Sequence, residues 1–489
     1  MNPRAIVLAL ACAFAGLAIT VHPPPTPGVG LRDFEAYYAA GVTWRYHGDP
    51  YGREVWRVER TVPGVVATRD ELLPFVGPPF GLPLWDALSR FPWPLASVVW
   101  SVVLTIAFAG LAFGSLRAAG GDAGILDALS VLLFAGCFGP LTSGVALGQV
   151  AVLSCAAIAV MPLLLGPRMT FAVAAAALVA MLQPNLALAL IVRATDRRAA
   201  IAFVLAGTIA AGGSLVALAG IGGIEHYLTV LREHAAAERF IAIQTTVAGV
   251  ARGFGISPSL AGACAIAVAL ATFVALAFQM MPGRYEPTER LTLACAALPL
   301  ALPFSHEHDF TLALLPAVVV TRRARGVAWV LGACASVAIS VDWLGLAQRP
   351  NALATATLLA VATALALAAL ARERLAPLHF LPLVVAFATL LAGTLAAGHA
   401  LPTWPDHLSP QFSVAAAAPA AAVWHAEQIA SGVGGLDPAW AFLRALSLAG
   451  CALLWGVGSA VLLTSRQSAP RSAPSSIPLR QPAATHPSA

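Results

Sequence analysis

The residues that could do chemistry begin just after the first apolar segment of the chain. Asp33 opens a polar stretch there, and Tyr37 follows it by one helical turn. In a helix, Asp33 and Tyr37 would share one face while Glu35 points elsewhere, so the two acids are not expected to act as a pair. A carboxylate held against the bilayer surface could take a proton from a bound substrate. The neighbouring aromatic rings could stack on a sugar or simply anchor the chain at the interface, and the residues alone leave both interpretations open.

A second polar run, Ser305–Asp309, lies at the end of a later apolar segment. Its His306 and His308 could bind a phosphate as imidazolium, could ligate a metal ion, or could belong to a solvated turn. Histidines two residues apart cannot share a helix face, and no third ligand can be identified, so no metal is expected. Three further amides stand alone at helix ends, where they could cap a helix, pack or contact a ligand: Gln149, Gln183 and Asn185.

The composition places these residues in a membrane protein. Of the 489 residues, 59% are hydrophobic and 10% are charged, whereas a soluble surface would be about a quarter charged. The chain contains no lysine, and its net charge of +5 is modest, so nucleic acid is not an expected partner. The seven cysteines are scattered singly through apolar segments, which is typical of helix-packing residues.

Apolar runs long enough to cross a bilayer follow one another along the chain. The first comes after Arg4 and lacks a good cleavage site, so we interpret it as an uncleaved span. Shorter runs lie at Leu291–Phe304 and Phe310–Val320. The longer runs are Ala5–Val21, Leu95–Leu116, Ile125–Leu141, Val150–Leu165, Ala199–Gly220, Ser259–Met281, Gly326–Leu344, Ala352–Ala371, Leu378–Ala397 and Ala439–Leu463.

The stretch Thr170–Val192 is broken in its middle by Gln183-Pro184-Asn185. If this stretch crossed the membrane once, Arg193 and every later basic cluster would fall outside, against the positive-inside rule. If it enters and returns, all of them fall inside with Arg4. A polar break also disfavours a continuous lipid-facing helix. The sequence therefore predicts two short helices in a hairpin, with the break at its outer tip and lining a cavity.

This topology places three long stretches outside the membrane, namely His22–Pro94, Gly222–Pro258 and His399–Pro438. Two tight turns, Thr142–Gln149 and Ser305–Asp309, are also expected to point outward. The outside stretches carry most of the histidine, tryptophan and acidic residues, while the inside loops carry little beyond arginine. Function is therefore expected on the outer face.

The expected domain organisation is simple. Residues 1–464 form one polytopic membrane domain, in which residues 22–94 are the first outside loop. Residues 465–489 are rich in serine, proline and alanine, and are expected to be a disordered cytoplasmic tail.

Several of the features above occur together and in a fixed order. Asp33 and Tyr37 come first. The features that follow them are Gly48-Asp49-Pro50-Tyr51, the Pro78-Pro79 turn before the second span, the Gly148-Gln149 pair at the start of a later span, Gln183-Pro184 at the hairpin tip, and the run from Leu302 to His308.

Over roughly residues 33–316 this order resembles glycosyltransferase family 87, whose members are membrane enzymes of the GT-C class related to polyprenol-phosphate-mannose-dependent mannosyltransferases. Three positions depart from that pattern. Gln183 stands where the family usually has lysine, His306 stands where it usually has tryptophan, and the asparagine that usually follows Gly-Gln is absent after Gln149.

The resemblance implies an all-α polytopic membrane protein of GT-C-like architecture, with about 12 to 14 transmembrane or half-membrane helices and a catalytic first outside loop. It implies an inverting glycosyltransferase that moves a hexose, with mannose as the expected sugar, from a polyprenyl-phosphate carrier to a lipid or glycan acceptor. The reaction would take place on the outer face of the cytoplasmic membrane. No cofactor is implied, and the expected partners are the donor, the acceptor and membrane lipids.

Within that chemistry Asp33 is the expected base. A lipid phosphate is already a good leaving group, so a second carboxyl acting as general acid is not needed. Arg32 is included among the binding residues on its charge alone, and the donor phosphate is expected nearest to Arg32 and His308. The expected substrate-binding residues are Arg32, Tyr37, Tyr51, Gln149, Gln183, Asn185, His306 and His308.

Two other functions stay open. A transporter or flippase of a lipid-linked molecule would carry ionisable residues at mid-membrane, but here the interiors of the expected spans are nearly free of charge. An inactive relative that serves in envelope assembly would fit the absence of the usual lysine at Gln183.

Overall fold

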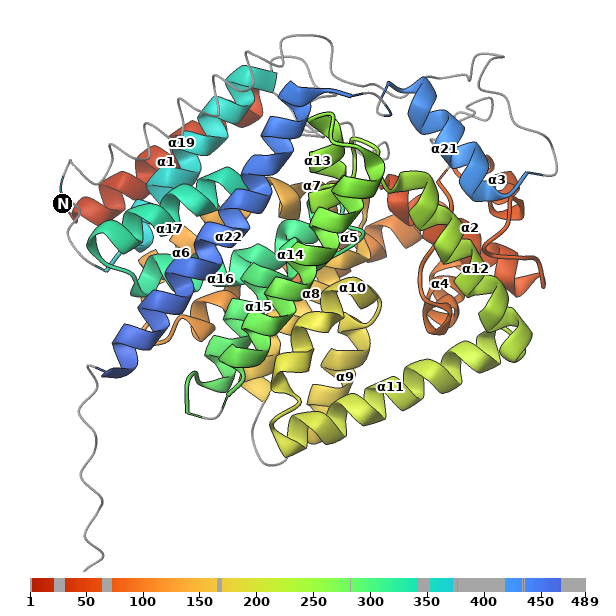
Figure 1. The fold of residues 1–489 in the computed structure, drawn as a ribbon, viewed down its shortest axis with the longest axis horizontal. Coiled ribbons are helices and arrows are strands. Elements are labelled where there is room, and N and C mark those ends of the chain that lie inside the picture. The colour runs from red at the N-terminus through yellow and green to blue at the C-terminus, as the bar shows by residue number, and fades with distance from the viewer. Residues whose placement is uncertain are drawn as a thin grey trace, which may run out of the picture.

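The computed structural model describes residues 2–21, 31–63, 73–164, 169–281, 283–341, 352–372, 376, 418–432, 434 and 436–467. Within these residues helices are the only regular secondary structure, and there is no strand (Figure 1). The helices are α1 (Pro3–Val21), α2 (Arg32–Arg45), α3 (Glu54–Glu59), η1 (Pro79–Gly81), α4 (Leu82–Ser89), α5 (Trp93–Ala118), α6 (Ile125–Cys137), α7 (Gly139–Leu147), α8 (Val150–Val160), η2 (Met161–Leu164), α9 (Thr170–Ala180), α10 (Pro184–Ala187), η3 (Leu188–Arg193), α11 (Arg197–Ala217), α12 (Ile221–Glu238), α13 (Val247–Gly253), α14 (Pro258–Gln279), α15 (Pro287–Ala301), η4 (Glu307–Ala313), α16 (Leu314–Arg323), α17 (Gly326–Ile339), α19 (Ala352–Leu370), α21 (Ala420–Ala430) and α22 (Pro438–Gln467).

Five of the described helices are long and apolar enough to cross a membrane: α1, α5, α11, α14 and α22. Shorter apolar helices, among them α8, α9 and α17, pack between them. Proline stands in the first turn of α5, α14 and α22, where its missing N–H costs no helical hydrogen bond. The fold is thus an all-α polytopic membrane protein. One expected span, Leu378–Ala397, most of the stretch His399–Pro438, and the tail beyond residue 467 lie outside the described residues.

The expected span Ile125–Leu141 is wrong in detail, because the chain bends by 66° between α6 and α7. Pro140 cannot continue the hydrogen-bond ladder of α6, so Phe138 adopts an extended conformation and α7 starts afresh at Gly139. The stretch predicted as a tight turn, Thr142–Gln149, is accordingly mostly helical, and the turn itself is confined to Gly148 and Gln149.

The predicted hairpin is confirmed. Helix α9 ends at Ala180, and a new helical segment, α10 and η3, starts at Pro184. The two ends of the stretch lie next to each other, since Met169 and Thr170 at its start line one small cavity with Arg197 and Arg198 just past its end. Helix α11 then packs along α9 (Figure 1). The polar break is therefore at one end of the hairpin, and the basic residues are at the other.

Arginines from distant parts of the chain form polar contacts on the side of the bundle where the hairpin's basic end lies, and Arg290 donates to Thr195 just past the hairpin at 2.9 Å. Asp127 pairs with both Arg4 and Arg322, the latter at 3.1 Å. Arg323 pairs with Glu289 at 3.0 Å and donates to the carbonyls that end α5. The structure thus brings together the loops for which the positive-inside rule predicted one side of the membrane.

The stretch around Asp33 is also helical and is packed against the bundle. Helix α2 lies on α4 so closely that a Cβ at Gly41 would be 2.3 Å from the main-chain carbon of Trp85. Arg45 at the end of α2 binds Asp86 of α4 at 2.5 Å. This contact fixes the position of α2, and therefore of Asp33 in its first turn.

Candidate functional site

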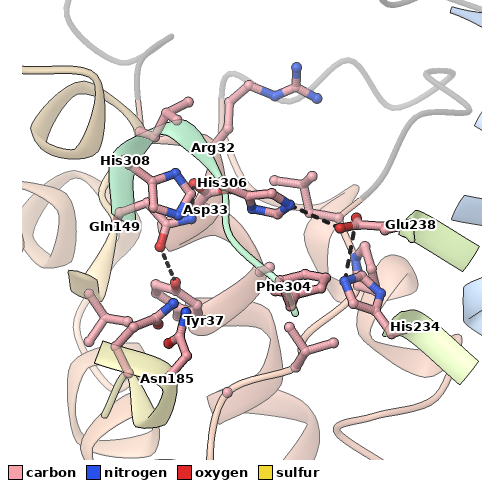
Figure 2. A pocket seen from close by; sticks show the side chains of 18 of the residues that line it. Arg32, Asp33, Tyr37, Gln149, Asn185, His234, Glu238, Phe304, His306 and His308 are labelled. Carbon is pink, nitrogen blue, oxygen red and sulfur yellow. Dashed lines mark hydrogen bonds and ion pairs between the residues drawn. The ribbon is translucent and has the colours of Figure 1, made fainter. Parts of the chain in front are cut away.

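A cavity of about 500 Å³ lies at the end of the bundle where the hairpin tip is found (Figure 2). It is bounded by α2, by the junction of α7 and α8, by the hairpin tip, by α12, and by the loop that joins α15 to η4. Its volume is in the range of pockets that hold small ligands. The polar residues that line it include Arg32, Asp33, Tyr37, Gln149, Gln183, Asn185, His234, Glu238, His306 and His308.

The side-chain amide of Gln149 holds Asp33, and the Tyr37 hydroxyl in turn orients that amide. The Gln149 amide nitrogen donates to the Asp33 carboxylate at 2.5 Å. The Tyr37 hydroxyl donates to the Gln149 carbonyl oxygen at 3.0 Å. Because Tyr37 is one turn after Asp33 on α2, the two side chains reach the same amide from one helix face, as the spacing predicted.

The backbone at Gly148 allows this arrangement. Gly148 ends α7 with φ 80°, a left-handed conformation that glycine adopts without strain. A Cβ at this position would be 2.9 Å from the Cβ of Phe34, the residue after Asp33. The Gly148 carbonyl also accepts from the Trp100 indole at 2.8 Å. The Gly-Gln pair therefore lets α2 approach closely and places Gln149 opposite Asp33.

A second buried carboxylate, Asp309, ties the hairpin tip to the histidine loop. The amide nitrogens of Gln183 and Asn185 donate to its two oxygens at 3.2 and 3.3 Å. The backbone N–H of His306 donates to the same carboxylate at 3.0 Å. Gln183 and Asn185 thus act on a neighbouring loop of the cavity wall as well as lining the cavity.

A third carboxylate, Glu238 at the end of α12, is fully buried and receives donors from several elements. Gln244 donates to it at 2.6 Å and Gln428 at 3.0 Å. The Trp424 indole donates to it as well. His306 lies 2.9 Å from one of its oxygens, and His234 lies 3.4 Å from the other.

Burial and neighbouring groups shift the pKa values of Asp33 and Glu238. Burial raises the pKa of Asp33 to about 6, although the Gln149 hydrogen bond opposes the shift. Burial alone would raise the pKa of Glu238, but the nearby His234 and His306 lower it to about 2.

The three histidines respond in opposite directions. Burial alone would lower the pKa of His306, but the Glu238 carboxylate raises it. Burial lowers the pKa of His308 far below its usual value, and it also lowers the pKa of His234. Of the three histidines, His306 is therefore the most readily protonated.

Of the residues predicted to bind substrate, the structure brings together all except Tyr51 in the cavity wall. Tyr51 lies behind that wall, where its hydroxyl donates to the Gly77 carbonyl at 3.0 Å and its ring packs on Tyr227 at 4.9 Å. Glu35, expected to point away from Asp33, is not among the lining residues.

The sequence prediction did not select His234, Glu238, Phe304 or Trp424, all of which line the cavity. His234 and Glu238 are four residues apart in a stretch expected outside, a spacing that puts both on one helix face. This four-residue spacing could have identified both residues from the sequence. By contrast, Trp424 follows a long stretch of chain, and no local pattern connects it to Glu238.

The cavity chemistry suits proton transfer at a carboxylate next to an anion-binding cation. Within the described residues no group of three or more histidine, cysteine or acidic side chains is arranged to hold a metal ion. Asp33 can accept a proton near neutral pH because its pKa is close to that range.

Fold and cavity together define a polytopic membrane protein with a polar chamber at one end of its helices. The family model of glycosyltransferase family 87 matches residues 75–305, so this part of the chain is similar to that family. The similarity indicates a membrane glycosyltransferase, an enzyme class that takes a sugar donor and an acceptor. No curated protein and no solved structure matches the chain.

Proposed function

We propose that the protein transfers a hexose, mannose in the first instance, from a polyprenyl-phosphate carrier to a hydroxyl group of a lipid or glycan acceptor. The architecture is GT-C-like, and the reaction takes place on the outer face of the cytoplasmic membrane. The observation that carries this proposal is the buried Asp33 carboxylate, which lines a cavity of about 500 Å³ and has a pKa raised to about 6.

In the proposed reaction Asp33 takes the proton of the acceptor hydroxyl as its oxygen attacks C1 of the sugar. The bond between C1 and the phosphate oxygen breaks, and polyprenyl phosphate leaves with the electron pair. The acceptor approaches from the face opposite the leaving group, so the configuration at C1 inverts. The phosphate leaves without protonation by a general acid, and one catalytic carboxylate is therefore sufficient.

The other carboxylates of the cavity support Asp33 as the base. Asp309 binds the hairpin tip and the His306 backbone N–H. Glu238 receives amide and indole donors, and its pKa of about 2 makes it a weak base. The pKa of Asp309 is also raised by burial, but only Asp33 of these two lines the cavity, so Asp33 is the better placed proton acceptor.

The position of the cavity supports an active site on the outer face. Helix α5 has 26 residues and is about 39 Å long, enough to span a bilayer. Its first residue, Trp93, stacks on Phe34 beside Asp33, and its last residue, Ala118, accepts from Arg323 in the basic end. If the basic end is cytoplasmic, the cavity is at the opposite surface.

The donor is tested by competition in membranes that contain the overproduced protein. Transfer of labelled mannose from polyprenyl-phosphate mannose is measured with an excess of unlabelled polyprenyl-phosphate mannose, and separately with unlabelled GDP-mannose in membranes depleted of polyprenyl phosphate. We expect the lipid-linked donor to compete and the nucleotide donor to have no effect. Competition by GDP-mannose, with none by unlabelled polyprenyl-phosphate mannose, would contradict the proposed donor.

A further inference from the structure

The Glu238 carboxylate has no part in the proton transfer proposed above, yet three side chains donate hydrogen bonds to it. Burying a charge in a protein interior is costly unless it is paired and hydrogen-bonded. Here Gln244, Trp424 and Gln428 all donate to Glu238. They come from two separate parts of the chain, the segment after α12 and helix α21. This arrangement keeps a full negative charge beside the cavity.

That negative charge is balanced by a cation that reaches the cavity. His306 and His234 both contact Glu238, at 2.9 and 3.4 Å. The His306 side chain is 23% exposed, whereas that of His234 is 8% exposed. The pKa of His306 is raised by Glu238, while burial lowers the pKa of His234. His306 is therefore the more readily protonated of the two and also the more accessible.

The orientation of the His306 ring leaves one nitrogen available. Its Nε2 faces Glu238, as Figure 2 shows, and also lies 2.8 Å from the Gln244 amide nitrogen. Its Nδ1 makes no hydrogen bond to any residue that the structure describes. A protonated ring in this position binds Glu238 through one nitrogen and can donate to an anion through the other.

His308 and Arg32 also line the cavity. His308 lies beside His306, with 5.4 Å between ring centres, but burial lowers its pKa so far that it is neutral. The Arg32 guanidinium points away from Asp33 in Figure 2. The titratable and charged groups that line the cavity or contact its wall around His306 are Arg32 and Asp33 from α2, His234 and Glu238 from α12, and Glu307, His308 and Asp309 from η4.

We propose that the His306–Glu238 pair is the phosphate-binding element of this cavity, in which His306 contacts the anionic phosphate and Glu238 is its positioning residue. The inference rests on the proposed function, because it requires a donor that carries a phosphate. It assigns to His306 the contact for which the sequence had favoured His308 and Arg32. Charge-assisted hydrogen bonds of this kind are about twice as strong as neutral ones.

The test measures equilibrium binding of a pair of probes to the purified full-length protein in nanodiscs. One probe is the methyl phosphodiester of a polyprenol, whose single charge does not titrate near neutrality. The other is the uncharged polyprenol of the same chain length. The ratio of the two dissociation constants isolates recognition of the phosphate from recognition of the lipid.

Four variants define the role of the pair. In His306→Gln we expect the preference for the phosphodiester to fall about tenfold or more. In His306→Lys the restored positive charge recovers most of it. In Glu238→Gln the preference is weak at neutral pH and returns as the pH is lowered. The matched control is His226→Gln, which breaks the exposed His226–Asp49 pair at 3.0 Å elsewhere on α12 and should leave the ratio unchanged.

The pH dependence distinguishes a role of the positive charge on His306 from a purely structural role of its ring. Because Glu238 raises the pKa of His306, the imidazolium is present at low pH and is lost as the pH rises through that raised pKa. The wild-type preference should therefore fall as the pH rises above the usual histidine pKa of about 6.5, and in Glu238→Gln the fall should come at lower pH. In His306→Lys it should persist throughout, because lysine titrates at about 10.4.

The outcomes are distinct. If the wild-type protein prefers the phosphodiester and His306→Gln keeps that preference, the inference about His306 is wrong while the proposed donor stands. If both His306→Gln and His306→Lys lose it although their melting temperatures match the wild type, the ring acts by shape, and the inference is again wrong. If the wild-type protein shows no preference at any pH, the phosphate-linked donor itself is contradicted.

Discussion

The proton acceptor proposed for this enzyme is a carboxylate whose pKa burial raises to about 6. Only the ionised form can accept a proton, so the pKa of Asp33 should appear in the rate of transfer. We expect kcat/KM to fall about tenfold for each pH unit below about pH 6, because the ionised fraction falls by that factor. Measuring kcat/KM from acidic to neutral pH checks this. A rate that stays constant down to the usual pKa of an aspartate would contradict a base in this environment.

The Tyr37–Gln149–Asp33 chain predicts a role for a hydroxyl that does not touch Asp33. Removing the hydroxyl in Tyr37→Phe frees the Gln149 amide, at a cost of about 1 kcal/mol, the usual net value of one hydrogen bond. We therefore expect kcat to drop about fivefold with little change in KM. The matched control is Tyr38→Phe on the same helix, which removes a hydrogen bond to the Phe91 carbonyl. Equal losses in both variants would indicate a general weakening of α2.

At the residue scale, the sequence predicted which residues share one face of a helix, but it did not predict which residues from distant segments come into contact. The spacing of Asp33 and Tyr37 was enough to place both on one face, and their shared contact with Gln149 follows from it. The contact of Glu238 with Trp424 depends on how α12 and α21 pack, and no pattern near either residue encodes that packing. For the same reason the sequence could not show which of His306 and His308 is the more readily protonated.

At the scale of elements, the close packing of α2 on α4 makes Gly41 a sensitive position. A Cβ there would be 2.3 Å from the Trp85 carbonyl carbon and oxygen, and main-chain atoms cannot move aside easily. We expect Gly41→Ala to lower the free energy of unfolding by about 1 to 3 kcal/mol and to displace Asp33. Thermal unfolding in detergent, together with the transfer rate, measures both effects.

Gly16→Ala is the control for that substitution. Gly16 is also inside a helix, but no atom lies within 4 Å of the Cβ that alanine would add. Alanine is the better helix former by up to about 1 kcal/mol, so this variant should be neutral or slightly more stable. If Gly41→Ala behaved like Gly16→Ala, the close approach of α2 to α4 would be contradicted.

The sequence predicted the Thr170–Val192 hairpin, but it did not predict the bend between α6 and α7. Charge distribution and a polar break together constrained Thr170–Val192, because both the lipid and the positive-inside rule penalise a single crossing. The bend between α6 and α7 depends on one proline in an otherwise apolar run, Pro140, and proline is tolerated in many membrane helices without ending them. Composition alone therefore could not separate one span from two helices.

At the scale of the whole molecule, the basic end and the cavity are at opposite ends of α5, α9 and α15. Helix α15 starts near the Glu289–Arg323 pair and ends at the loop that carries His306. The access of a membrane-impermeant thiol reagent to single cysteines tests this arrangement, with the exposed positions Arg117, Arg197 and Glu233 as sites. We expect Glu233→Cys to react in intact cells, and Arg117→Cys and Arg197→Cys to react only after permeabilisation.

The native cysteines need one control, because Cys12 is exposed on α1. The unsubstituted protein gives the background, and a Cys12→Ala variant removes its most accessible thiol. Labelling of Arg117→Cys and Arg197→Cys on opposite sides of the membrane would contradict the hairpin, because an even number of crossings must separate these two positions.

Sugar transfer by Asp33→Asn is the most direct test of the proposal that Asp33 is the catalytic base. Purified membranes are supplied with radiolabelled polyprenyl-phosphate mannose and the native lipid extract, and the labelled product is quantified at equal protein abundance. The matched control is Glu35→Gln, a substitution of an acid on the same helix that does not line the cavity. We predict that the wild type and Glu35→Gln form product, while Asp33→Asn is slower by about 10²- to 10⁴-fold, the usual contribution of a general base. Equal labelling by Asp33→Asn and the wild type would contradict Asp33 as the base.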